Sequence, residues 1–110
     1  MIQDRLDKIE ERLKQSNTVK ESERAELLSL LTTLRMEIAG LSHTHHEQAE
    51  SIAGFAELSA REATRSKKNS ELFNLSIEGL ASSVQGFEVS HPELVGIINT
   101  FCAMLAKLGI

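Results

Sequence analysis

The chain has 110 residues, 25% of them charged, and a net charge of −4 at neutral pH. A single proline and an aromatic set limited to four phenylalanines disfavour a β-sandwich, which needs turn formers and strand-forming aromatics. The modest acidity gives no reason to expect a nucleic-acid partner, and no apolar run approaches the roughly 20 residues of a membrane-spanning helix. We therefore expect one small soluble, cytoplasmic domain over 1–110, with no membrane partner.

Apolar residues at helical spacing dominate the N-terminal region, 1–41. Two amphipathic segments are separated by the S-N-T run at 16–18, whose side chains favour caps and turns. Thr18 and Glu21 have the spacing of a capping box, which predicts the start of the second segment. In both segments the apolar residues form one narrow stripe: Ile2, Leu6, Ile9 and Leu13, then Leu27, Leu31, Leu34, Ile38 and Leu41.

The stretch 41–44 admits two interpretations. Thr44 and Glu47 form another capping-box spacing, which favours a break and a separate middle helix over 44–65. The heptad phase continues without a skip, which is typical of one helix over about 20–65. We favour the break. The inner face of the middle helix is predicted to permit close helix approach, since small residues line it with one isoleucine: Ala49, Ile52, Ala53, Ala56, Ala60 and Ala63.

The C-terminal region, 69–108, is predicted to be an antiparallel helical hairpin. A short loop over 66–70 precedes it, and Asn69 suits the N-cap position of its first helix. Each arm carries large apolar residues at spacings of four and three, which we interpret as core or interface positions: Phe73, Ile77, Leu80, Val84 and Phe87, then Leu94, Ile98, Phe101, Leu105 and Leu108.

The turn between the two arms contains the only proline. Ser90 and Glu93 have capping-box spacing, so the serine hydroxyl is expected to accept from a first-turn amide. Pro92 falls in the first turn, where its missing donor has no cost. His91 completes this helix-cap turn and is expected to hydrogen-bond locally rather than act in acid–base chemistry. At the C-terminus, Ile110 is expected to fold back onto apolar surface.

These patterns predict an all-α protein, with helical hairpins in a coiled-coil-like bundle of four to five helices. Narrow stripes of two apolar residues per heptad suit pairing with one neighbour better than filling a globule. We therefore expect the chain to self-associate as a homo-oligomer, for which a dimer or a tetramer is the commonest closed form.

The C-terminal half also carries a family resemblance. The run F-E-V-S-H-P at 87–92, followed by an apolar helix ending in L-G-I at 108–110, resembles the C-terminal signature of a family of short bacterial proteins called domain of unknown function 4404. The runs at 63–69 and 79–87 resemble its longer members, while over 1–59 the likeness is one of helical pattern. The resemblance implies an all-helical fold. It implies no catalytic residues, because that family has no established activity.

Histidines and carboxylates cluster at the start of the middle helix. On a helix, His43, His46, Glu47 and Glu50 share one face, and imidazole and carboxylate are ligands for zinc and similar divalent ions. The pattern is not H-E-x-x-H, and neither a cysteine nor a second ligand run completes four-coordination. A solvated, histidine-rich helix start is the ordinary interpretation. We therefore predict no cofactor, and these four residues remain the candidates for a metal site.

Two further features have ordinary structural interpretations. Arg61, Arg65, Lys67 and Lys68 form a basic run, but nucleic-acid or phosphate binding would need more positive charge and interleaved aromatics, so we interpret it as a charged helix end. Cys102 lies beside the core stripe without an electropositive setting that would make it reactive. As the only cysteine, it also excludes an internal disulfide.

No catalytic constellation is present, so we predict a protein that is not an enzyme. The leading interpretation is a self-associating protein-interaction or structural module, open to a further protein partner. The alternative is a divalent-metal-binding bundle that uses the segment 43–50. A third class binds anionic partners through 61–68, and its affinity would fall with salt.

Overall fold

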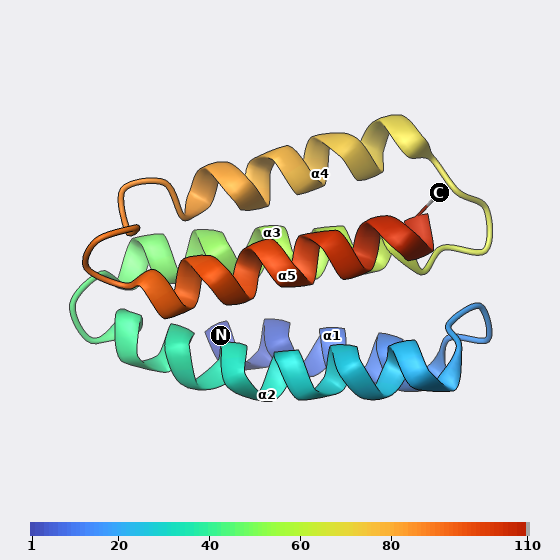
Figure 1. The fold of residues 1–110 in the computed structure, drawn as a ribbon, viewed down its shortest axis with the longest axis horizontal. Coiled ribbons are helices and arrows are strands. Elements are labelled where there is room, and N and C mark those ends of the chain that lie inside the picture. Colours follow the sequence, from blue (N-terminus) through green and yellow to red (C-terminus); the bar gives the residue numbers. More distant parts are fainter. Residues whose placement is uncertain (110) are drawn as a thin grey trace.

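The computed structural model describes residues 1–109 and shows five α-helices in that range (Figure 1). They are α1 (Ile2–Gln15), α2 (Glu21–Ser42), α3 (His46–Ala63), α4 (Ser70–Ser83) and α5 (Pro92–Gly109). The predicted all-α bundle of four to five helices is confirmed. The break predicted near 41–44 is confirmed as well, because α2 ends and α3 begins on either side of it. The fold-back predicted for Ile110 lies outside the described residues.

Successive helices run in alternating directions and pack around α3, which contacts all four of the others. Figure 1 shows α2 and α5 side by side in front of α1 and α3, with α4 along the edge formed by α3 and α5. α1 packs on α2 and α3 at the opposite edge, and among the described residues α1 and α4 do not touch. The outer side of α3 between them is therefore not covered by another helix.

The central position of α3 follows from the small residues on its inner face. An alanine face lets neighbouring helices approach more closely than large side chains would, so that several helices can surround one at the packing density of a protein interior. The predicted inner face is confirmed, since its residues are fully buried: Ala49, Ile52, Ala53, Ala56, Ala60 and Ala63.

The apolar stripes of the helices close one core within a single chain. Of the predicted hairpin positions, Ile77 and Leu108 are half-buried and the others are buried. The premise that such narrow stripes suit pairing with one neighbour better than filling a globule is wrong, because each of the five described helices contacts at least two others. Self-association itself stays a prediction. Among the fully buried side chains are Leu6, Ile9, Leu13, Leu27, Leu31, Leu34, Ile38, Leu41, Leu80, Leu94, Ile98, Phe101 and Leu105.

The two arms of the predicted C-terminal hairpin, α4 and α5, run antiparallel and contact each other, but each packs more extensively on another helix. α4 packs most extensively on α3 and α5 on α2, and the contact between α4 and α5 is smaller than either. α4 also ends at Ser83, before Phe87. Gly86 then adopts φ +97°, a left-handed conformation that glycine takes without steric cost and that redirects the chain. A loop over 84–91 therefore stands where the sequence predicted a longer helix and a tight turn.

Helix starts agree with the sequence at α4 and differ elsewhere. Asn69 caps α4 as predicted, because its side-chain oxygen accepts a hydrogen bond from the backbone amide of Leu72 at 3.1 Å. The capping boxes predicted at Thr18 and Thr44 are wrong, since the observed N-cap residues are Lys20 and His45. Acidic residues still occupy the first turns of α2 and α3, where the helix dipole favours them.

The predicted helix-cap turn before α5 is also displaced by one residue. Because Pro92 is the first helical residue, His91 occupies the N-cap position in place of Ser90. The hydroxyl of Ser90 hydrogen-bonds with Nδ1 of His91 at 3.0 Å instead of capping the helix. Glu93 becomes the second helical residue, which is one position too early for the reciprocal bond of a capping box.

Two buried serines provide a paired test of polar burial. Ser59 Oγ on α3 has no hydrogen-bond partner among the described residues, whereas Ser76 Oγ on α4 donates to the carbonyl of Phe73 at 2.7 Å. Ser59→Ala should raise the free energy of unfolding by about 1 kcal/mol, because it removes an unpaired buried hydroxyl. Ser76→Ala gains the same helix propensity but loses a bond, so it should be neutral or destabilising. Urea unfolding measures both, and a less stable Ser59→Ala would contradict this account.

Candidate interaction face on helices α3 and α4

The uncovered outer side of α3 carries a stripe of residues with opposite charge at its two ends. Glu47, Ser51, Gly54, Leu58 and Arg61 follow one another at spacings of four and three, so they share one side of the helix. Glu47 and Arg61 are both exposed and stand about four turns apart, with Gly54 midway. These five residues, acidic at the start, small and apolar in the middle and basic at the end, are called the α3 stripe below.

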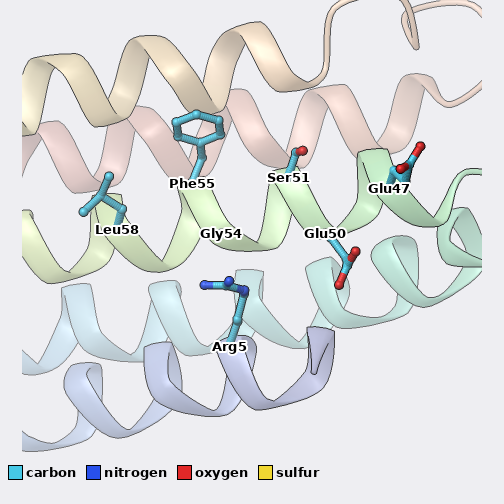
Figure 2. Close-up of a pocket in the computed structure, with 7 residues that line it drawn as sticks. All are labelled: Arg5, Glu47, Glu50, Ser51, Gly54, Phe55 and Leu58. Carbon is cyan, nitrogen blue, oxygen red and sulfur yellow. The ribbon is translucent and has the colours of Figure 1, made fainter.

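A shallow depression of about 490 Å³ follows the α3 stripe from Glu47 to Leu58 (Figure 2). Arg5 reaches it from α1 and donates from Nη1 to Oε1 of Glu57 at 3.0 Å. The guanidinium lies 3.8 Å from the point where a Cβ of Gly54 would stand, so it packs over this part of the helix. Figure 2 shows Arg5 extending toward α3, whereas Phe55 and Leu58 point toward α4. The lining residues are Arg5, Glu47, Glu50, Ser51, Gly54, Phe55 and Leu58.

Exposed apolar side chains continue from this depression onto α4. The ring of Phe55 covers Gly79 so closely that a methyl group there would overlap it. Leu72 and Leu75 precede Gly79 by about two turns and one turn, so they share its side of α4. Phe55, Leu58, Leu72 and Leu75 are called the apolar strip; Phe55, Leu72 and Leu75 are 37%, 44% and 58% exposed. Exposed apolar side chains on one side of two neighbouring helices are typical of an interaction surface.

The histidine-rich segment is divided by the fold. His43 lies in the turn after α2 and α3 begins only at His46, so the prediction that the four candidate ligands share one helical face is wrong. His43 and His46 line a depression beside the start of α1, whereas Glu47 and Glu50 line the depression along the α3 stripe. His46 Nε2 lies 3.7 Å from Oε1 of Glu50. Within residues 1–109, no three His, Cys, Asp or Glu side chains gather closely enough to hold a metal ion.

Two histidines join the α2–α3 loop to the α4–α5 loop. The ring of Phe87 lies edge-to-face against His45 and His91, with ring centroids 5.4 and 5.5 Å away. Each imidazole Nδ1 pairs with the hydroxyl of the preceding residue, Thr44 at 2.8 Å and Ser90 at 3.0 Å. His91 therefore hydrogen-bonds locally, as expected. The cluster itself was not predicted, because its two loops are far apart in the sequence.

The groups with shifted pKa values lie on three separate elements. Burial raises the pKa of the Cys102 thiol on α5 to about 11, so the thiol is protonated at neutral pH and is a poor nucleophile. The pKa of Glu10 on α1 is lowered by hydrogen bonds from Lys14 and Arg35. Burial lowers the pKa of Lys68 in the α3–α4 loop. Perturbed groups of a catalytic site usually meet in one cleft, and these three do not.

The fold and the surface together define a small all-α helical-bundle protein. No helix within residues 1–109 is long and apolar enough to cross a membrane. The chain belongs to the family described as Domain of unknown function (DUF4404), whose model matches residues 2–110. The match therefore includes the N-terminal helices, where the sequence resembled the family only in its helical pattern. Comparisons with curated proteins and with solved structures found no match.

Proposed function

We propose that this protein is a non-enzymatic interaction module that pairs with a second copy of itself through the apolar strip and the α3 stripe. The apolar strip is the observation that carries the proposal. Leu72 and Leu75 remain about half exposed beside Phe55, so three of the exposed large apolar side chains of the described residues lie on two neighbouring helices. Covering such side chains on association is favourable by about 25 cal/mol for each Å² removed from water.

The charges of the α3 stripe support a second copy as the partner. In a dimer whose two-fold axis passes near Gly54, the two α3 helices run antiparallel and the same surface meets itself. Glu47 of one copy then lies opposite Arg61 of the second copy, and the reverse pair forms at the other end. A parallel arrangement would place like charges opposite each other, which is unfavourable. The stripe is therefore complementary to itself in one orientation.

Action through contacts rather than catalysis is supported by the chemistry of the surface. The depression along the α3 stripe is shallow, and the groups with shifted pKa values lie on separate elements. A divalent-metal role for the segment 43–50 lacks comparable support, because the fold divides its ligands between two depressions. The single free cysteine fits the reducing cytoplasm, where we place the protein.

The proposal predicts that Leu75→Glu converts the dimer into a folded monomer. Leu75 is 58% exposed in one chain, so a glutamate there reaches water in the monomer but would be buried without a partner in the dimer. Light scattering after size exclusion should give twice 12.2 kDa for the unchanged chain and 12.2 kDa for the variant. Met36→Glu is the matched control, because Met36 is 70% exposed on α2, outside the strip, and the dimer should persist.

A charge exchange tests the antiparallel orientation. Glu47→Arg and Arg61→Glu should each weaken the dimer, because each places like charges opposite each other. The double exchange should restore it, since opposite charges then face each other again. An unchanged chain that is monomeric at every concentration would overturn the proposed dimer. A double exchange weaker than both single variants would overturn its orientation.

A further inference from the structure

The end of the bundle at the α3–α4 loop carries a second, strongly basic depression. It has a volume of about 550 Å³ and is called the basic pocket. The sequence predicted a charged helix end here and kept the binding of anionic partners through 61–68 as a third possibility. The fold adds Arg12 from α1, more than fifty residues away in the chain, because its side chain reaches Thr64 at 3.2 Å. The pocket is lined by Arg12, Arg65, Ser66, Lys67, Lys68 and Asn69.

The positive charge of the basic pocket is only partly neutralised by the protein. Arg12 donates from Nε to the neutral hydroxyl of Thr64. Arg65 pairs at 2.9 Å with Glu62, whose carboxylate is only 3% exposed and therefore faces the interior. Lys68 donates to a backbone carbonyl. Within residues 1–109, Lys67 forms no ion pair. The pocket thus has four cationic side chains, and one buried carboxylate neutralises part of their charge.

The backbone of the loop offers further donors to an anion. Among the described residues, the amides of 65–69 donate to no backbone carbonyl. Asn69 lines the basic pocket and caps α4, so the first-turn amides and the positive dipole end of α4 lie at the same end of the bundle as the pocket. Burial also lowers the pKa of Lys68 by disfavouring its charged form, and an anion in the pocket would favour that form again.

We propose that the basic pocket binds a phosphate or pyrophosphate group. Guanidinium groups recognise phosphate oxygens with paired donors, and lysine adds point charge. A single carboxylate would leave most of the four cations without a counter-charge, whereas a pyrophosphate group engages several of them. The lining contains no aromatic residue on which a base could stack, so the recognised element is the phosphate itself rather than a nucleic-acid strand. This pocket is separate from the apolar strip, so the inference does not depend on the proposed dimer.

Calorimetric titration with inorganic pyrophosphate tests the proposal. The unchanged chain should bind, with an affinity that falls as salt is raised. Lys67→Ala should weaken binding at least tenfold, as should Arg12→Ala. Lys8→Ala is the matched control, since it removes the same charge from α1 one turn before Arg12, outside the pocket. Circular dichroism verifies that each variant is folded.

Sedimentation with vesicles containing phosphatidic acid distinguishes a lipid headgroup from a free ligand. If the protein binds the vesicles, if Lys67→Ala abolishes this binding and if pyrophosphate displaces it, the recognised phosphate belongs to a lipid headgroup. If the protein binds pyrophosphate but not the vesicles, the recognised phosphate belongs to a free ligand. Either result supports the pocket. Absence of both kinds of binding at low salt overturns the proposal, as does a Lys8→Ala variant that loses as much affinity as Lys67→Ala. The titration is repeated on Leu75→Glu, and the same affinity in this variant separates the pocket from self-association.

Discussion

Phe101→Ala should lower the free energy of unfolding by about 4 kcal/mol, which is a large share of the stability of a small domain. Phe101 is the largest fully buried side chain, and it lies on α5 where that helix faces the rest of the bundle. Its truncation removes buried apolar surface and leaves a cavity that neighbouring helices fill only in part. Urea unfolding followed by circular dichroism at far-ultraviolet wavelengths measures the loss.

Phe55→Ala is the matched control for this variant. The same atoms are removed, but the Phe55 ring is 37% exposed at the edge of α3 in a single chain, so the expected loss is about 1 kcal/mol when both variants are measured in the monomeric Leu75→Glu background. Equal losses for the two variants would contradict the assignment of the core. They would mean that Phe101 is not packed as described.

Arg24→Ala should lower the free energy of unfolding by about 3 kcal/mol, because one guanidinium holds the end of α1 and the following loop together. Its side chain is only 16% exposed. The carbonyls at the C-terminus of α1 have no partners within the helix, and a positive charge there is also favoured by the helix dipole. The carbonyls that accept from Arg24 are those of Leu13, Lys14, Ser16 and Val19.

Two further variants separate this bonding from charge alone. Arg24→Lys should recover little stability, because a single ammonium group cannot span several carbonyls. Arg35→Ala should cost less than about 1 kcal/mol, although Arg35 also joins α2 to α1, since its partners Asp7 and Glu10 are well solvated. Thermal unfolding of all three chains gives the comparison. A lysine variant as stable as the unchanged chain would contradict the proposed role of the guanidinium.

The role of Arg24 illustrates a kind of contact that sequence patterns do not reveal. The residue occurs in a charged first turn of α2, where it looks like any solvated arginine. Its partners are backbone carbonyls, which every residue possesses, so no partner residue type marks the interaction. Only the path of the loop over 16–20 brings those carbonyls within reach of the side chain.

The candidate interaction face on α3 and α4 was likewise not predictable from the sequence. Leu72 and Leu75 lie outside the predicted stripe of their helix, and isolated apolar residues of this kind are common on protein surfaces. They become a strip only because α4 packs on α3 with Phe55 over Gly79. The four candidate metal ligands show the opposite case, since a helix that begins at His46 divides residues that the sequence places together.

The sequence by itself determined which segments are helical and which side of each helix is buried, and it favoured the break at 41–44 over one continuous helix. These properties are local, because a repeat of three and four residues specifies an apolar side whatever that side later contacts. The tertiary structure alone decided that α3 lies at the centre and that the stripes close within one chain. The physical reason is that packing partners depend on the combined shapes of segments that are distant in the sequence. An alanine face admits several neighbouring helices at once, and the sequence of one helix does not specify which helices those are.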